Sequence, residues 1–261
     1  MSCVVSRISA VFKKRLKHVG RQTASRFFGL NPEKLESISR DVSQIKKVLA
    51  QDTSVRGGEH PYHGLPVAVV AGLDRSGTTA FRTSLSEHPQ IHSTGKEDRL
   101  IGDLLRVAHD QCTEKTRRHN LQIDEETLCR CFEHALYQLL WPVPYDGGRT
   151  PQVLLATHMR ASFPEWVFRM LPNSKMFYIV RNGVEVVSSM IAHPKFFNNH
   201  TFEQMCGLWA DCQHVAEWGE GQEAFMLVRH EKLLSRTTAE PVYQRIFDRL
   251  PIAYHPACLE R

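Results

Sequence analysis

A short glycine-containing stretch, GLDRSG at residues 72–77, is the first place in the sequence where chemistry can be expected. It follows the apolar run VAVVA and precedes Thr78 and Thr79. Two glycines at this spacing, between a strand and a helix, are typical of a phosphate-binding loop, whose backbone N–H groups and helix N-terminus bind phosphate oxygens. A nucleoside triphosphate loop continues with a lysine, which this chain lacks, so the pattern disfavours a kinase or a GTPase. Together with the cation of Arg75, it predicts a site for one phosphate that carries a second small anionic group.

A second candidate anion site lies about one hundred residues further along the chain. The stretch YIVRNGVEVVSSM puts Arg181 at the end of an apolar run and Ser189 eight residues later, on the helix expected to follow. Both side chains can then point at one anion, because an arginine guanidinium and a helix hydroxyl are both hydrogen-bond donors.

These two motifs resemble the sulfotransferases that use 3′-phosphoadenosine 5′-phosphosulfate (PAPS). The resemblance covers about residues 65–250 and is nearest to the tyrosylprotein branch, in RSGTTxxRxxLxxHPxI and RNGxxxxxSMI. It implies that Arg181 and Ser189 hold the 3′-phosphate and that Trp209 lies near the adenine. His230 stands where the family usually has a tyrosine. The residues implied to hold the 5′-phosphosulfate are Arg75, Ser76, Gly77, Thr78 and Thr79.

The same resemblance offers two candidates for the base that takes the acceptor's proton. In EHPQIHSTGKEDRLI, at residues 87–101, Glu97 aligns, after one inserted residue, with the catalytic glutamate of tyrosylprotein sulfotransferases. In LLATHMRASF, His158 matches the catalytic histidine of cytosolic sulfotransferases. We expect Glu97 to be the base and His158 to be an auxiliary donor to the sulfuryl group, with the reverse assignment left open. Arg75 is the third catalytic candidate, because its charge can stabilise the leaving phosphate.

One departure from the family concerns Ala156, which occupies the place of a lysine that approaches the bridging oxygen in both branches. Its loss removes about 3 kcal/mol of transition-state stabilisation, unless Arg160 or His158 substitutes. We also expect the segment that closes over the 3′-phosphate to be short or absent. These two departures keep open an alternative, a catalytically degenerate nucleotide-binding or interaction protein with a sulfotransferase fold.

The elements that must position these residues follow from the hydrophobic pattern. Short, continuously apolar runs alternate with helical patterns from Val67 onward, which indicates a parallel sheet covered on both faces. The fold class is therefore α/β: a P-loop-like three-layer α/β/α arrangement with a central parallel sheet. Residues 97–140 are expected to be helical. The expected strands are VAVVA, QVLLAT, KMFYIV and AFMLVRH, and further helices are expected to begin near Thr78, Phe163, Gly183, Phe202 and Thr238.

Charge separates an N-terminal region from this α/β domain. The chain has 261 residues and a formal charge of +5, but residues 1–32 hold seven Lys and Arg side chains and no acid. This leaves −2 for the rest, which argues against a nucleic-acid surface on the main domain. Residues 4–19 form a basic amphipathic pattern and residues 35–49 a short coiled-coil pattern. We therefore divide the chain into an N-terminal helical region with a linker, 1–60, and a sulfotransferase-like domain, 61–261.

Composition also bounds the setting of the protein. Seven cysteines without a CxxC pair suggest neither a disulfide framework nor a zinc site, so we expect a cytoplasmic protein without a metal. No apolar run approaches the roughly 18 residues of a membrane span. The helical region at residues 4–50 can instead bring the protein to an anionic membrane surface or to a second subunit. The expected substrates are PAPS and a hydroxyl acceptor: a protein tyrosine, a saccharide or another metabolite.

Overall fold

A parallel sheet of five strands forms the centre of the described part of the chain. The computed structural model describes residues 60–93, 100–113, 124–141, 151–159, 164–193 and 197–260. The strand order is β2-β3-β1-β4-β5. The strands are β1 (Val67–Gly72), β2 (Ile91–Ser93), β3 (Val153–Met159), β4 (Ser174–Val180) and β5 (Phe225–Arg229). All six residues of β1 are buried, because this strand lies between β3 and β4 and is covered on both faces.

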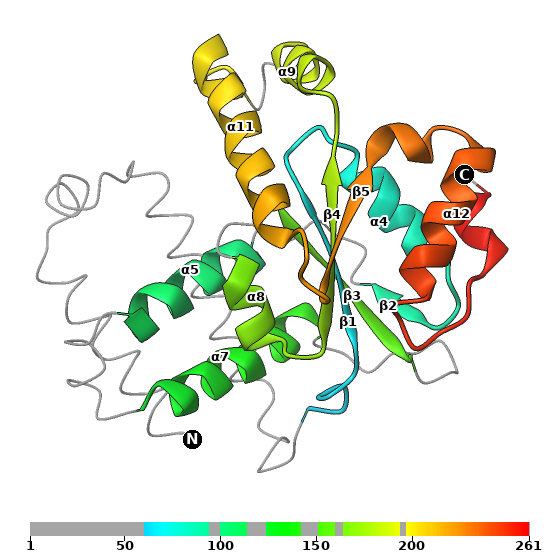
Figure 1. Cartoon of the computed structure of the whole chain (residues 1–261). Coiled ribbons are helices and arrows are strands. Elements are labelled where there is room, and N and C mark those ends of the chain that lie inside the picture. The colour runs from blue at the N-terminus through cyan, green and yellow to red at the C-terminus, as the bar shows by residue number, and fades with distance from the viewer. Residues whose placement is uncertain are drawn as a thin grey trace, which may run out of the picture. The chain divides into compact units, whose positions relative to one another are not determined.

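Helices cover both faces of the sheet, as Figure 1 shows for α5, α8 and α11 on one side and α4 and α12 on the other. Side chains alternate along β1, so Val69 packs into one hydrophobic cluster and Val70 into the other. This confirms the predicted three-layer α/β/α arrangement. The helices are α4 (Thr78–Ser86), α5 (Leu100–Thr113), α7 (Glu125–Leu140), α8 (Pro164–Met170), α9 (Gly183–Ile191), α11 (Phe202–Gly219) and α12 (Arg236–Phe247), with 3₁₀ turns η1 (His230–Leu233) and η2 (Pro256–Leu259).

Local capping chemistry explains where several helices begin. The side chain of Asn182 accepts hydrogen bonds from the first amides of α9, and Thr201 forms a reciprocal capping box with Gln204 at the start of α11. Helix α12 begins at Arg236, two residues before the predicted Thr238, because Ser235 is its N-cap and Thr238 N donates to it. Phe163, the predicted start of α8, lies outside the described residues.

Strand β2 is the element that the hydrophobic pattern did not predict. It has three residues and, among the strands that the structure describes, pairs with β3 alone, Ile91 lying opposite Val153. A three-residue edge strand is too short to show a period, so its existence depends on the neighbouring strand.

The predictions for residues 1–59 lie outside the described residues, so the division of the chain near residue 60 stays a prediction. Among the described residues, no helix is long and apolar enough to cross a membrane, and no group of three or more His, Cys, Asp or Glu side chains could hold a metal ion.

Candidate functional site

The loop between β1 and α4 has a backbone shape that depends on its residue types. Gly72 approaches β4 so closely that a Cβ there would lie 2.6 Å from the carbonyl oxygen of Ile179. Gly77 has φ 96°, and a Cβ there would lie 2.4 Å from Cδ2 of His230. Arg75 also has a positive φ, 74°, which is uncommon for a residue with a side chain. These conformations bring the loop against β4 and the residue that follows β5.

The start of α4 is suited to bind an anion. No side chain caps this helix, and its first turn contains no acidic residue. The first amides of an α-helix have no acceptor four residues earlier, so they point along the axis toward any bound anion. Ser76 N donates to Leu73 O over 3.1 Å and closes the preceding turn. A phosphate or sulfate group therefore fits the predicted loop, in which Ser76 and Thr78 are buried and Thr79 is exposed.

The side chain of Arg75 joins this loop to α9. Its Nε donates to Oγ of Ser189 over 3.0 Å, and its Nη2 lies 3.2 Å from Nε2 of His193. Since a guanidinium only donates, Nε2 of His193 must accept, and the proton of the neutral ring is then on Nδ1. Nδ1 lies 2.8 Å from the carbonyl oxygen of Ser189 and donates to it. The two predicted phosphate motifs, 114 residues apart in the sequence, thus meet at one place.

Arg181, directly after β4, and Trp209, on α11, complete this cluster. Arg181 Nη1 donates to the carbonyl oxygen of Arg75 over 3.2 Å, and Arg181 Nε donates to Oε2 of Glu185 over 2.8 Å. The indole Nε1 of Trp209 donates to the carbonyl oxygen of Arg181 over 3.1 Å. The ring packs on Gly183, where a Cβ would lie 2.8 Å from the indole. The phosphate loop, the Arg181 and Ser189 motif and Trp209 therefore belong to one network at the carboxyl ends of β1 and β4.

His230 and Glu231, which follow β5, add titratable groups to this edge. Burial, followed by the nearby charge of Arg181, lowers the pKa of His230. Burial alone would raise the pKa of Glu231. Hydrogen bonds from its own amide and from Asn182 N, the latter over 2.8 Å, lower the pKa by more than burial raises it, so the pKa lies below its usual value. Neither Glu231 nor His193 was predicted as a site residue, because their partners are distant in the sequence.

The structure leaves the catalytic base untested. Glu97 and Arg160 lie outside the described residues, and so does the side chain of His158. The backbone of His158 belongs to β3, where it lies opposite Ala71 near the carboxyl end of β1. Ala156 is buried in the cluster that packs against α8 and α11. The assignment of Glu97 as base and of His158 as donor therefore remains a prediction.

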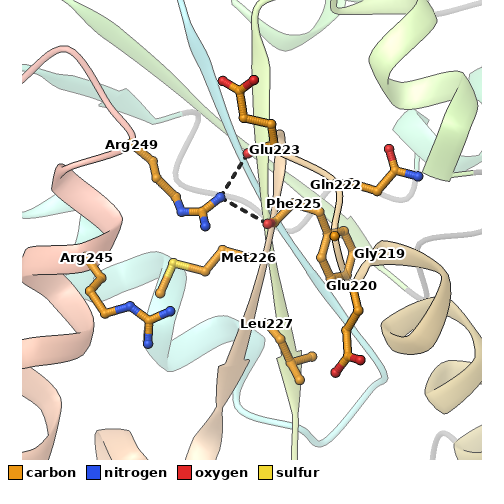
Figure 2. Close-up of a pocket in the computed structure, with 10 residues that line it drawn as sticks. Gly219, Glu220, Gln222, Glu223, Phe225, Met226, Leu227, Arg245 and Arg249 are labelled. Carbon is orange, nitrogen blue, oxygen red and sulfur yellow. Dashed lines mark hydrogen bonds between the residues drawn. The ribbon is translucent and has the colours of Figure 1, made fainter.

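A hollow elsewhere in the domain, drawn in Figure 2, does not coincide with this site. This hollow lies at the first residues of β5. It is lined by the turn after α11, by Arg245 of α12 and by Arg249, which lies just after that helix. Arg249 Nη1 donates to the carbonyl oxygens of Glu223, over 2.9 Å, and Phe225, over 3.1 Å. That guanidinium holds the start of β5, at the amino ends of the strands, whereas the phosphate loop lies at their carboxyl ends.

Comparison with known proteins gives the family. Residues 66–256 match the model of the sulfotransferase family, a range that includes the loop, Arg181, Ser189 and Trp209. The chain belongs to the sulfotransferase family. The chain is 29% identical over 167 residues to protein-tyrosine sulfotransferase 1 of Homo sapiens, over 58% of this chain and 42% of the human protein. It is 24% identical over 206 residues to the protein-tyrosine sulfotransferase of Drosophila melanogaster, over 76% of this chain and 40% of that protein.

These relatives confirm the predicted nearness to the tyrosylprotein branch. The chain spans less than half the length of either relative. Among solved structures, the sulfotransferase domain of the Synechococcus PCC 7002 olefin synthase aligns with a TM-score of 0.50 and 14% identity, over 76% of this chain and 78% of that one. That likeness shows a shared fold.

Proposed function

We propose that this protein transfers a sulfuryl group from PAPS to a hydroxyl acceptor. The observation that carries the proposal is the meeting of the two anion motifs, in which the Arg75 side chain donates to Ser189 and Arg181 donates to the backbone of Arg75. A nucleotide with a phosphate at each end of its ribose needs two such motifs side by side. The absence of the loop lysine disfavours a nucleoside triphosphate as the ligand.

The residues present fit this donor. The uncapped start of α4 and the Arg75 guanidinium would bind the 5′-phosphosulfate. Arg181 and Ser189 would bind the 3′-phosphate, and the indole of Trp209 would contact the adenine. Glu185, which pairs with Arg181, holds that guanidinium at the edge of the site.

The chemistry asks little of the protein beyond positioning and charge. PAPS supplies the sulfuryl group, so that an S–O bond to the acceptor forms as the bond to the phosphate oxygen breaks, giving 3′,5′-ADP. Glu97 would take the proton of the acceptor hydroxyl, and His158 would donate to the sulfuryl oxygens. Arg75 and the amides of α4 would stabilise the charge on the leaving phosphate. Since Ala156 cannot supply the lysine's charge, we expect slow turnover.

The names of the relatives make a tyrosine hydroxyl in a peptide the first acceptor to test. Saccharide and small-metabolite hydroxyls are the next classes. The assay measures transfer of labelled sulfuryl from PAPS to each acceptor, with wild type, Glu97→Ala, His158→Ala and, as a control, Glu126→Ala on the exposed face of α7.

We expect Glu97→Ala to lower the rate by about 100-fold or more, with a smaller loss for His158→Ala and none for the control. A larger loss in His158→Ala would reverse the two roles. Binding of 3′,5′-ADP without transfer to any acceptor would favour the degenerate nucleotide-binding protein instead.

The setting of the enzyme is a separate proposal. We infer from the basic amphipathic pattern of residues 4–19 that the N-terminal region brings a cytoplasmic domain to an anionic membrane or to a second subunit. Deletion of residues 1–59 should abolish binding to anionic vesicles or dimerisation and leave 3′,5′-ADP binding intact. Loss of folding in the deleted protein would instead make the region part of the domain core.

A further inference from the structure

Arg82, on α4, is a buried arginine without a partner among the described residues. Its side chain and backbone together are only 8% exposed, and its Nε is buried without a hydrogen bond. Arginine stays protonated in proteins, and a buried charge without a counter-ion is strongly unfavourable. A buried guanidinium whose Nε has no acceptor among the described residues is therefore a candidate binding group for an anion.

The position of Arg82 on α4 gives the direction of its side chain. Side chains of a helix lean toward its N-terminus, which here is the phosphate loop. Ser84 lies about 200° further around the helix and faces α12, where it accepts a hydrogen bond from Tyr243 over 2.6 Å. Arg82 therefore lies on the flank turned away from α12. Helix α4 also packs against β2 and β3.

Thr157, on β3, is a second unpartnered polar group on this side of the sheet. It is 2% exposed, and its Oγ1 is buried without a hydrogen bond to any described residue. Leu155, two residues earlier, packs in the cluster that contains Phe81 of α4. Because side chains alternate along a strand, Thr157 points to the same face as Leu155. It lies two residues before Met159, the last residue of β3.

We propose that Arg82 and Thr157 form an oxyanion subsite between α4 and the carboxyl end of β3. Arg181, which directly follows β4, and Ser189, on α9, lie on the other side of the phosphate loop, because β1 separates β3 from β4 in the sheet. The subsite therefore lies on the side of β3, the strand to which the backbone of His158 belongs. Its ligand is either the sulfonate of the bound donor or an acidic group of the acceptor. This inference rests on the proposed function.

The test compares Arg82→Gln and Thr157→Val with wild type, and uses Arg245→Gln, an exposed arginine of α12, as the matched control. Calorimetry measures five affinities: for 3′,5′-ADP, for inorganic sulfate with 3′,5′-ADP at saturation, for PAPS, and for an acidic and a neutral tyrosine peptide, each bound to the 3′,5′-ADP complex. Thermal unfolding of each variant is measured in the same buffer.

We expect 3′,5′-ADP to bind all four proteins equally. If the ligand is the sulfonate, Arg82→Gln should weaken sulfate and PAPS binding by about tenfold or more. If the ligand is on the acceptor, only the acidic peptide should lose affinity, by a similar factor. In either case Thr157→Val should act in the same direction and more weakly. Both variants should unfold at or above the wild-type temperature, because Arg82→Gln replaces a buried charge by a neutral amide and Thr157→Val removes a buried hydroxyl.

Unchanged affinities for sulfate, PAPS and both peptides in the two variants would overturn the subsite. If Arg82→Gln does not fold, Arg82 has a structural role, and Thr157→Val alone decides in the same way. If wild type does not bind 3′,5′-ADP, the proposed function fails. A sulfate affinity that still falls in Arg82→Gln would then support the subsite by itself.

Discussion

Arg75 combines a functional side chain with an unusual backbone, and two substitutions separate these properties. Its φ of 74° is left-handed, which costs a residue with a Cβ about 1–2 kcal/mol. Arg75→Ala keeps this cost and loses the hydrogen bonds to Ser189 and His193. Arg75→Gly loses the same hydrogen bonds and removes the strain, although the greater chain entropy of unfolded glycine offsets part of the gain. We expect Arg75→Gly to be more stable than Arg75→Ala by about 1 kcal/mol.

The two lost hydrogen bonds are exposed and together contribute about 1 kcal/mol, so Arg75→Gly should be close to wild type in unfolding free energy. Urea unfolding measures this difference, which corresponds to roughly 2–4 °C in melting temperature for a domain of this size. Both variants should lose 3′,5′-ADP affinity to the same extent, because both remove the guanidinium. Equal stability of the Gly and Ala variants would refute the left-handed conformation, and wild-type affinity in both would refute the role of the side chain.

Three further predictions concern the same edge of the sheet. Gly77→Ala should lower the unfolding free energy by about 1–2 kcal/mol through its positive φ alone. The double variant Gly77→Ala/His230→Ala should relieve only the added contact with the imidazole and keep the loss due to φ. Urea unfolding that shows no loss of stability in Gly77→Ala would contradict this. Because the pKa of His230 is lowered from 6.5 in the folded state, the folded protein binds fewer protons, so this residue's stability contribution is present above pH 6.5 and is lost as the pH falls through the folded pKa. The unfolding free energy, measured between about pH 5 and about pH 8, should depend less on pH in His230→Gln than in wild type. Identical pH profiles of the two proteins would exclude the effect. Trp209→Phe should weaken 3′,5′-ADP binding by about tenfold by losing the hydrogen bond to Arg181, whereas Trp218→Phe, on the same helix, should not; equal affinities in calorimetry would place the nucleotide elsewhere.

The sheet could be predicted from the sequence because its central strands are apolar on both faces. VAVVA and MFYIV are continuous hydrophobic runs, and glycine, asparagine and threonine residues mark the turns and helix starts that follow them. Strand β2 has no such signal, since its three residues become a strand only by pairing with Val153–Leu155 of β3.

The site was predictable to the extent that its residues belong to local motifs. Arg75 lies in the glycine-containing loop after β1, Arg181 directly follows β4, and Ser189 lies eight residues later on α9. His193 has no local signal, because its hydrogen bond to Arg75 joins residues 118 apart in the sequence. From the sequence alone, Arg82 is expected to be an exposed residue of α4. Its burial depends on the elements that pack around that helix.

The central claim, a nucleotide site built from the loop and from Arg181, is tested most directly by calorimetric titration of 3′,5′-ADP. Wild type is compared with Arg181→Ala and with Arg236→Ala, an exposed arginine of α12, and ATP with Mg²⁺ serves as the competing ligand. We predict binding of 3′,5′-ADP to wild type and to Arg236→Ala, a loss of about tenfold or more in Arg181→Ala, and weaker binding of ATP. Preferential binding of ATP with Mg²⁺, or equal 3′,5′-ADP affinity in all three proteins, would contradict the proposed site.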